Sequence, residues 1–572
     1  MIKLKKEKLF ELLNQMTIEE KLGQMIQITA DPFNSSSSSD TGPTKDLNLT
    51  DEMIYNVGSI LNIAGSTTIK SIQEQYLEKN RNHIPLLFMG DIINGYKTIF
   101  PIPLLQGCSW DLNLISKASS ISAKECGYAG IHVNFYPMVD LVRDARWGRV
   151  MESISGEDPF LGSLYSKAIV DSYHKNNIAC CAKHFIGYGA VEGGKEYNKV
   201  DINIHDLYQY YLPAFKSCID SSIDMIMPSF NTLNGIPCTA NTWLLQDLLR
   251  KGLNFNGVII SDYSAIYELI AHGYATDESD AALKALEATV DIEMMSSTYI
   301  HHLCNLINSN KNLEEKINTA VFRILTLKNN LGLFENPYVN LNSEKEKTYI
   351  LCKENREIAR KVASNTFVLL ENKNNILPLN NETKICLIGP YSNNIALSGS
   401  WSIYSKNELS TVTLKDGLYN KLNKTFPFEK GCDILPKEEF YNLDPSIKEF
   451  SNSNNKDINN YNINSALDIA KNSDVIILAL GEHYKQSGEG ASRSNIKLPN
   501  VQIQLLNSLL PLNKPMICIL FSGRPLEISY LADNVDALLW VRLSWNRRWK
   551  CNIRCIISVS YTHLRAHETG AY

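Results

Sequence analysis

Eight short apolar runs, separated by segments long enough for helices, fill the first half of the chain and constrain its fold more than any other feature. Runs of this kind are typical of parallel strands buried on both faces. Their alternation with helical segments predicts a (β/α)8 barrel over residues 1–330. The runs are Leu22–Ala30, Gly58–Ala64, Pro85–Asp91, His132–Asp140, Ile178–Phe185, Ser222–Phe230, Gly257–Asp262 and Ala288–Met295.

Charged and aromatic side chains stand at the C-terminal ends of several runs. Barrel enzymes carry their chemistry at this rim. Acids, bases and aromatics together predict a pocket for a polyhydroxylated ligand, because charged groups bind vicinal hydroxyls and aromatic rings cover an apolar ring face. For Asp262 alone, the alternative is that it caps the next helix. The residues are Asp91 in the third run, Lys183 and His184 in the fifth, Met227 and Phe230 in the sixth, and Asp262 in the seventh.

A second α/β domain is predicted over residues 356–540, after a linker over 331–355 that loses apolar periodicity. Its apolar runs NTFVLLEN, KICLIGPY, VIILALGE, MICILFSG and the run before Trp540 predict the strands of an open, largely parallel sheet with helices between them. The polar stretch Ser451–Asn464 is interpreted as a surface loop.

Composition narrows the classes of partner and the compartment. The net charge of −5 gives no sign of a nucleic-acid partner, and no apolar run is long enough to span a bilayer. The N-terminal segment predicts an amphipathic helix and lacks the apolar core of a signal peptide. Thirteen cysteines without zinc-site spacing indicate reduced thiols, so a cytoplasmic location is expected. No metal and no organic cofactor are expected.

Four motifs resemble glycoside hydrolase family three: MTIEEKLGQM, RWGRVMESISGEDP, KHFIGYGAVEGGKEYNKVDI and GVIISDYSAIYEL. The resemblance implies a barrel followed by an α/β sandwich. It also implies that Asp262 is the catalytic nucleophile and that Tyr263 occupies the position of an aromatic residue that flanks the sugar. By the same resemblance, the sugar hydroxyls are held by Asp91, Arg149, Lys183 and His184. The alternatives are a surface ion pair for Arg149 and a simple turn for Glu157-Asp158-Pro159.

The glycine-rich segment Gly481–Arg493 follows a predicted buried strand of the second domain. In the family that this chain resembles, the corresponding loop delivers the general acid/base, which Glu489 matches best. Glu482 is the second candidate, although its place at the strand end suggests a structural role. An anion-binding nest or a plain loop are the other readings of this segment. Trp401 lies in a second small-residue loop, GSWS.

The resemblance implies a retaining, exo-acting β-glycosidase that removes terminal β-D-glucosyl residues from carbohydrate substrates. β-Xylosidase or exo-glucanase activity stays open within the family. An N-acetylglucosaminidase is ranked low, because Tyr188 stands where those enzymes carry a histidine. A lyase using Lys183 as a Schiff base and a non-catalytic sugar-binding protein are alternatives from other classes.

The last segment, residues 541–572, differs in character from both domains. VRLSWNRRWKCNIRC is basic and rich in tryptophan, and VSYTHLRAHET looks like a translated sequencing adapter. We interpret this tail as a frameshift followed by an artefact, which would leave the second domain C-terminally truncated. Truncation is expected to expose the strand Ala537–Trp540 as an unpaired sheet edge.

Overall fold

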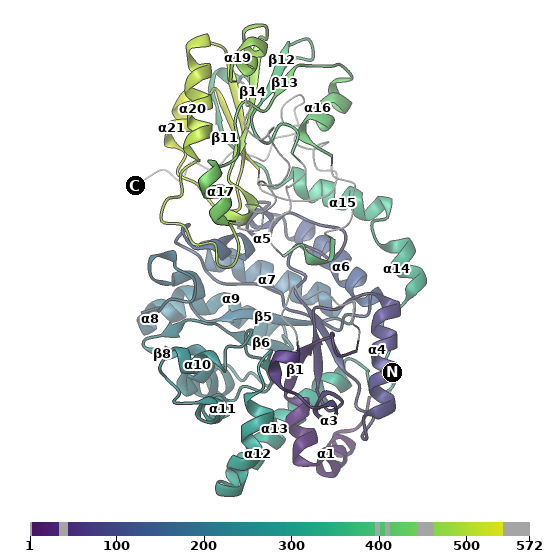
Figure 1. The fold of residues 1–572 in the computed structure, drawn as a ribbon. Helices are drawn as coiled ribbons and strands as arrows, with labels where there is room; N and C mark the ends of the chain where they lie inside the picture. The colour runs from purple at the N-terminus through teal and green to yellow at the C-terminus, as the bar shows by residue number, and fades with distance from the viewer. Residues whose placement is uncertain (1–2, 34–43, 395–400, 406–411, 444–462, 542–572) are drawn as a thin grey trace.

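The computed structural model describes residues 3–33, 44–394, 401–405, 412–443 and 463–541, which form two α/β domains stacked end to end (Figure 1). The predicted loop Ser451–Asn464 lies outside the described residues, apart from its last two residues, which begin helix α19 (Ile463–Lys471). The predicted tail lies outside them from residue 542 onward. In the part of the chain that is described, no helix is both long enough and apolar enough to cross a membrane.

The first domain is a ring of eight parallel strands in the order β10-β1-β2-β3-β4-β5-β6-β9. A parallel bridge between Ile260 and Ile292 joins the two ends of this order and closes the ring. Each predicted apolar run contains one strand, which confirms the predicted barrel. The strands are β1 (Ile26–Thr29), β2 (Ser59–Leu61), β3 (Leu87–Gly90), β4 (Val133–Asn134), β5 (Ala179–Phe185), β6 (Met225–Pro228), β9 (Val258–Ile259) and β10 (Glu293–Met294).

Helices surround the ring and connect its strands (Figure 1). The predicted amphipathic N-terminal helix is α1 (Lys6–Gln15), which buries Leu9 and Leu13. The other helical segments are α2 (Ile18–Gln24), α3 (Asp51–Ile54), α4 (Ser66–Lys79), α5 (Pro103–Gly107), α6 (Leu112–Tyr128), α7 (Pro159–His174), α8 (Ile204–Asp206), α9 (Leu212–Asp220), the π-helix η7 (Trp243–Gly252), α10 (Glu268–Ala271), α11 (Glu278–Glu287), α12 (Thr298–Ser309) and α13 (Asn312–Asn330).

Two local features of the barrel follow directly from its sequence. The Asp158 side chain accepts hydrogen bonds from the backbone N–H groups of Phe160 and Leu161, so the GEDP motif is the N-cap of α7 with proline at its first position. The hairpin β7 (Thr232–Leu233) and β8 (Ile236–Pro237) was not predicted. Its signal is Asn234-Gly235, both with positive φ, the usual pair of a two-residue hairpin turn.

The second domain is a six-stranded sheet in the order β11-β16-β15-β14-β12-β13, parallel except that β11 runs antiparallel to β16. This confirms the predicted open sheet and adds the short edge strand β13. Helix α14 (Ser343–Tyr349) lies in the predicted linker and packs on the barrel helices α4 and α6. The further elements are α15 (Lys353–Ser364), β11 (Val368–Asn372), β12 (Ile385–Ile388), α16 (Leu414–Leu422), β13 (Phe428–Glu429), α17 (Lys437–Leu443), β14 (Val475–Gly481), α20 (Asn500–Leu509), β15 (Met516–Phe521), α21 (Ser529–Asn534) and β16 (Ala537–Val541).

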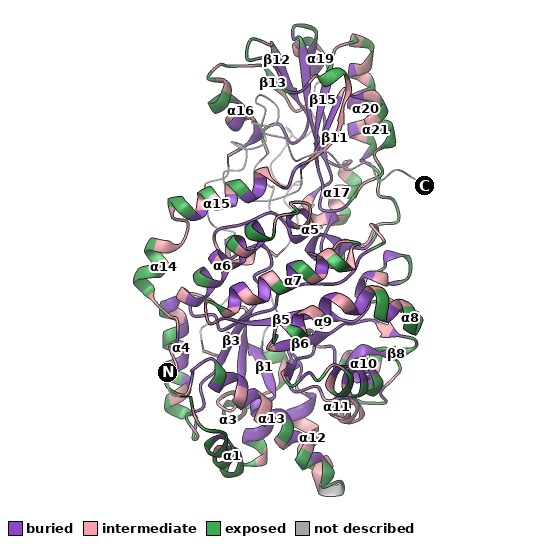
Figure 2. Cartoon of the chain, turned by 180° about the vertical axis from the view of Figure 1, so that it is seen from behind, coloured by how far each residue is buried: buried purple, intermediate pink, exposed green. Residues whose placement is uncertain are grey.

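Both faces of the second sheet are covered, as the buried strands and the exposed outer sides of the helices show (Figure 2). Alternate residues of β14 point to opposite faces. Ile477 packs in one core with Leu418 of α16, and Ile476 packs in the other with Leu505 of α20. The domain is therefore an α/β sandwich with helices on both faces.

The expected exposed edge at Ala537–Trp540 is wrong. Strand β16 lies inside the sheet, paired in parallel with β15 on one side and antiparallel with β11 on the other. Its backbone groups are engaged on both sides, because β11, which precedes the rest of the sheet in sequence, returns to pair with it. The apolar side chains of Ala537, Leu538 and Leu539 are buried.

The point where the ring closes depends on a buried carboxylate. Asp291, just before β10, is fully buried and lies 2.6 Å from Arg250 Nη2 of η7 and 2.8 Å from Arg323 Nη1 of α13. It also accepts a 2.8 Å hydrogen bond from the backbone N–H of Ile259 in β9. One carboxylate therefore ties the closing strands to two outer helices.

Replacing Asp291 by Ala should lower the free energy of unfolding by about 3–5 kcal/mol, because it strands two guanidinium groups without their buried counter-charge. The matched control is Asp171→Ala, which removes an exposed helical ion pair with Lys167 (3.2 Å) and should cost at most about 0.5 kcal/mol. Chemical and thermal denaturation measure both. Similar losses in the two variants would contradict the assigned role of Asp291.

Candidate active site

A cavity of about 360 Å³ opens at the C-terminal ends of the barrel strands and receives residues from both domains. Eight of the nine predicted site residues line it, and the ninth, His184, lies directly behind Asp262. Trp401 and Glu489 reach the cavity from the second domain. The remaining lining residues are Leu61, Asn62, Asp91, Arg149, Lys183, Tyr197, Met227, Phe230, Asp262, Tyr263, Glu268, Met294 and Ile403.

Asp262 lies just beyond β9 and does not cap α10, which begins several residues later. Its Oδ1 accepts a 2.7 Å hydrogen bond from the backbone N–H of Tyr263, and its Oδ2 faces His184. Burial raises the pKa of Asp262 to about 7, and the nearby charge of Glu489 adds to this, whereas Arg149 and Lys183 oppose it. The oxygen that is free of backbone contacts is therefore Oδ2.

His184 is oriented by a buried partner. Asp140 Oδ2 lies 2.8 Å from His184 Nδ1 and accepts a 3.0 Å hydrogen bond from the His184 backbone N–H. Burial lowers the pKa of His184 well below its usual value, helped by the positive charges of Arg149 and Lys183. Burial also raises the pKa of Asp140, to about 8. A neutral imidazole is thus held with Nε2 3.4 Å from Asp262 Oδ2.

Asp91 and Lys183 form a buried pair at one side of the cavity. Lys183 Nζ lies 2.8 Å from Asp91 Oδ1, and Asn62 Nδ2 donates to Asp91 Oδ2 at 3.1 Å. Burial opposes the charge of Lys183, but the Asp91 carboxylate more than offsets it and the pKa of Lys183 is raised. A Schiff-base lysine must lose its proton to attack, so this pairing disfavours the lyase alternative.

Arg149 does not form a surface ion pair, which was the alternative to a role in the site. Its side chain is 2% exposed, and its Nε and Nη2 donate to the two carboxylate oxygens of Glu152 at 2.9 and 3.0 Å. This bidentate contact fixes the guanidinium plane. Its remaining nitrogen, Nη1, faces the cavity and lies 3.3 Å from Glu489 Oε1.

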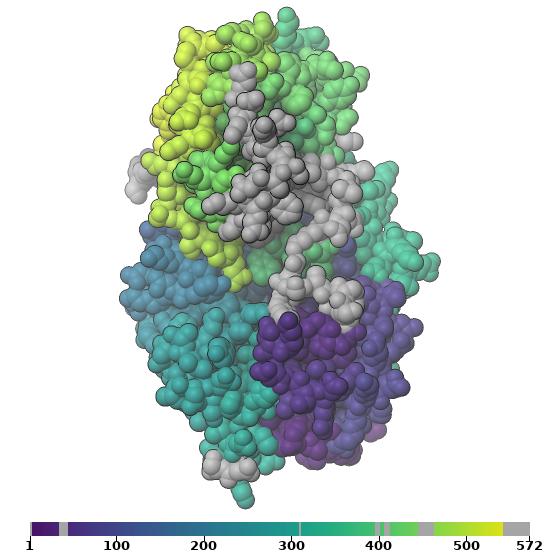
Figure 3. All heavy atoms as spheres, viewed as in Figure 1, coloured from purple at the N-terminus to yellow at the C-terminus, as the bar shows by residue number. Residues whose placement is uncertain are grey.

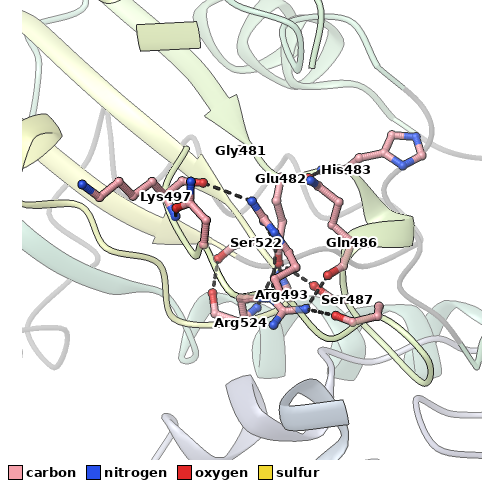
Figure 4. Close-up of polar contacts among 12 residues, drawn as sticks. Gly481, Glu482, His483, Gln486, Ser487, Arg493, Lys497, Ser522 and Arg524 are labelled. Carbon is pink, nitrogen blue, oxygen red and sulfur yellow. Dashed lines mark hydrogen bonds and ion pairs between the residues drawn. The ribbon is translucent and has the colours of Figure 1, made fainter. Parts of the chain in front are cut away.

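The two candidate acids of the second domain lie in very different surroundings. Glu489 sits between Gly488 and Gly490, both with positive φ, and its partly exposed carboxylate accepts a 3.1 Å hydrogen bond from Tyr197 OH. Glu482 directly follows β14, is fully buried and does not line the cavity. Figure 4 shows it enclosed by polar partners. This geometry favours Glu489 as the group that reaches a bound molecule.

Aromatic side chains form part of the cavity wall and its mouth. Tyr263 and Tyr197 are 37% and 43% exposed, and the ring of Tyr197 packs edge-on against Phe230 with centroids 5.0 Å apart. The ring of Trp401 lies 5.4 Å from Lys183 Nζ and 5.8 Å from Arg149 Cζ. Such rings cover an apolar face of a bound molecule while the charged groups bind its polar edges.

Several residues of the cavity and its supports were not identified as such from the sequence. Asn62 follows β2, and the strand-end rule that selected Asp91 also applies to it. Tyr197 lies within the motif Lys183–Ile202, although nothing in the motif separates it from its neighbours. Glu152 follows Arg149 by three residues, a spacing that allows a local ion pair, whereas the partner of Asp140, His184, is 44 residues away and becomes evident only in three dimensions. Within the described residues, no group of three or more His, Cys, Asp or Glu side chains is arranged to bind a metal.

Proteins with related sequences and structures are glycosidases. A periplasmic β-glucosidase of Salmonella typhimurium is 34% identical, over 92% of this chain and 69% of its own length. A β-xylosidase of Formosa agariphila is 32% identical over 78% of this chain, which spans only 62% of that protein. The crystal structure of a Listeria innocua β-glucosidase with isofagomine matches with a TM-score of 0.88 and 40% identity, over 97% of this chain and 74% of that one.

The expected cytoplasmic location is contradicted by the Salmonella relative, which is named a periplasmic enzyme. The expectation rested on the lack of a signal-peptide core in the N-terminal segment and on reduced thiols. Most cysteines of the described part are buried in the two cores, where they pack as small apolar side chains. Such thiols do not report the redox state of a compartment, and we withdraw the expectation.

Two family models together cover most of the chain. The N-terminal domain model of glycosyl hydrolase family 3 matches residues 17–327, and the C-terminal domain model of the same family matches residues 367–547. These spans coincide with the barrel and the sandwich, and the second ends within the predicted tail. The chain therefore belongs to glycosyl hydrolase family 3.

Proposed function

We propose that this chain is a retaining exo-β-glucosidase, with Asp262 as the nucleophile and Glu489 as the general acid/base. The observation that carries the proposal is the shared cavity: carboxylates from two domains enter one pocket that also contains Asp91, Arg149 and Lys183. The barrel, residues 1–330, contributes the nucleophile and the hydroxyl-binding groups. The second domain, residues 356–540, contributes the acid.

In the first step, the ionised carboxylate of Asp262 attacks the anomeric carbon while Glu489 gives its proton to the departing oxygen. Tyr263 N–H holds Oδ1 and His184 Nε2 lies 3.4 Å from Oδ2, so the carboxylate has a fixed orientation at the cavity wall. In the second step Glu489 removes a proton from water, which hydrolyses the glycosyl ester. Retention of configuration requires carboxyl groups about 5–5.5 Å apart.

Glucose is favoured as the sugar by the relatives. The Listeria innocua β-glucosidase has been crystallised with glucose (40% identity, TM-score 0.88), and a mutant of it with laminaribiose (38% identity). The Formosa β-xylosidase supports xylose as the second candidate. Comparing kcat/KM for aryl β-glucosides and β-xylosides on this protein decides between the two sugars.

Replacing Asp262 by Gly should reduce hydrolysis of an aryl β-glucoside below detection, because no glycosyl ester can form. Added azide should restore turnover and produce an α-configured glucosyl azide, identified by NMR, because the anion attacks from the face that the carboxylate occupied. The circular dichroism spectrum serves as the control for folding. Near-wild-type hydrolysis by the variant would rule out the nucleophile assignment.

Replacing Glu489 by Ala should lower kcat/KM by about 10²–10⁴-fold for phenyl β-glucoside, but far less for the activated 2,4-dinitrophenyl β-glucoside, because protonation matters most for a basic leaving oxygen. Azide should give a β-configured product in this variant. Glu482→Gln, which keeps Glu489, should give no β-configured azide product. Equal losses on both substrates in Glu489→Ala would contradict its assignment as the acid.

A nucleophile that must ionise in a buried site costs stability, and the cost depends on pH. The raised pKa of Asp262, about 7, means that the folded chain binds this proton more tightly than the unfolded chain. Its contribution to stability is therefore fully present below pH ~4 and lost as the pH rises to about 7. Asp262→Asn removes this loss and keeps the shape of the side chain.

The variant Asp262→Asn should match the wild type in thermal stability at pH 4 and exceed it at pH 8. One pKa unit corresponds to about 1.4 kcal/mol, so the difference should reach a few kcal/mol. Thermal unfolding of both proteins across this pH range measures it. Asp140 titrates in both proteins and cancels from the comparison. A difference that does not change with pH would contradict the raised pKa.

A further inference from the structure

Arg524 is completely buried where the two domains meet, just beyond the end of β15. The yellow-green part of the second domain rests directly on the blue part of the barrel in the space-filling view (Figure 3). Arg524 does not line the active-site cavity. A buried guanidinium is costly unless its charge and its N–H groups are satisfied, so its partners indicate what it holds in place.

The guanidinium donates to backbone carbonyls on both sides of the domain contact. Its Nη1 donates to Ala145 O at 2.9 Å and to Arg146 O at 2.8 Å, in the barrel segment that leads to Arg149. Its Nη2 donates to Gln486 O and, at 2.6 Å, to Ala491 O. Residues 486 and 491 flank Glu489 in the sequence, so the Arg524 side chain binds both ends of the turn that carries Glu489.

Glu482 supplies the charge that Arg524 needs. Its Oε2 lies 3.4 Å from Arg524 Nε and accepts from Arg493 Nη1 at 3.0 Å. Its Oε1 accepts from the backbone N–H of Gly523 at 2.7 Å and from Ser487 Oγ. Figure 4 shows these groups converging beneath the loop. Glu482 therefore anchors the guanidinium and also the start of the loop.

The turn is closed by a backbone hydrogen bond from Ala491 N–H to Gly488 O at 3.2 Å, and its two glycines add no side-chain contacts. Glu489 is flanked by Gly488 and Gly490, and a Cβ added at Gly490 would meet no heavy atom within 4 Å. The backbone N–H of Gly488 donates to Gly148 O at 2.8 Å. Glycines lose the most conformational freedom on ordering, so a fixed position for Glu489 needs anchors outside the glycines.

We infer that Arg524 is a positioning residue for Glu489: by binding carbonyls on both sides of the domain contact, it places the acid loop against the barrel segment that carries Arg149. The inference rests on the proposed role of Glu489. Arg524 touches no substrate and acts only through the loop. The planar, forked guanidinium is essential for binding several carbonyls at once, because its five N–H groups point in fixed directions. The ammonium of lysine instead carries its three donors on one nitrogen.

The test compares Arg524→Lys with a matched control, Arg250→Lys. The side chain of Arg250 is only 8% exposed, donates to the carbonyls of Phe255 and Gly257, and pairs with a buried carboxylate, Asp291. It lies at the base of the closing strands of the barrel, away from the cavity lining. Both substitutions keep the charge and remove the fork, so the effect of losing a buried fork alone appears in the control.

The kinetic measurement is kcat/KM, which reports glycosylation, for phenyl and 2,4-dinitrophenyl β-glucosides. Arg524→Lys should lose at least about 30-fold on the phenyl substrate and less than about 3-fold on the activated one, because a displaced acid harms the substrate with the basic leaving oxygen. Arg250→Lys should change both rates by the same factor. Equal losses in Arg524→Lys, or wild-type rates, would overturn the inference.

A second measurement does not depend on catalysis. Hydrogen exchange of the peptide covering residues 486–493 should be at least about tenfold faster in Arg524→Lys than in the wild type and unchanged in Arg250→Lys, because released loops open at low free-energy cost. Unchanged protection in Arg524→Lys would overturn the inference. If Glu489→Ala shows no leaving-group dependence, the proposed acid is wrong, and the exchange result still decides whether Arg524 anchors the loop.

If Arg524→Lys does not fold, a second variant tests the inference. Glu482→Gln keeps an oxygen for the Gly523 N–H and removes the charge that holds Arg524. It should show the same selective loss on the phenyl substrate, smaller than in Arg524→Lys, together with faster exchange of residues 486–493. A folded Glu482→Gln variant with normal exchange and equal losses on both substrates would overturn the inference.

Discussion

The contact between the loop Gln486–Ala491 and the barrel segment Ala145–Arg149 is the constraint on which the site depends. Neither domain holds a complete set of groups: the buried carboxylate Asp262 comes from the barrel and Glu489 from the sandwich. The two segments approach so closely that a Cβ on Gly148 would lie 2.1 Å from Gly488 O. A side chain at that position would push the loop away from the barrel. A glycine at position 148 is therefore required for the contact that brings Glu489 to the cavity.

Buried charges in this site occur in compensating sets, and each set leaves one group directed at the cavity or at Asp262. Glu152 occupies two nitrogens of Arg149 and leaves Nη1 facing the pocket. Asp140 engages one side of His184 and leaves Nε2 facing Asp262. Paired groups of this kind cost less to bury than isolated ones. The pairing behind the cavity thus determines which atoms are presented to a substrate, and the raised pKa of Asp262 is the part of the cost that remains.

Much of this arrangement could be predicted from the sequence, and the omissions have physical causes. Buried strands appear in the sequence as apolar runs. All eight barrel strands could therefore be predicted, and so could the strand ends that carry Asp91 and Asp262. The pairing of β16 on both sides was missed, because β11 reaches it from the other end of the domain and local patterns carry no information on such partners. The same limit applies to His184 with Asp140, which lie 44 residues apart in the sequence. The predicted cytoplasmic location was wrong for another reason: buried cysteines are core residues and do not indicate the compartment of a protein.

The separation of Glu482 from Glu489 shows how a short segment can serve two purposes. Strand β14 ends at Gly481, and the residue that follows is still fixed by the sheet, so its carboxylate is buried and can serve as a counter-charge for Arg524. Seven residues further along, the chain has left the sheet and turned over the barrel, where the Glu489 carboxylate is partly exposed and contacts Arg149 and Tyr197. A rigid acid at the strand end could not reach the cavity, and a glycine-flanked acid without anchors would not stay there. In this fold Glu482 anchors Arg524, and Arg524 in turn anchors the loop that carries Glu489.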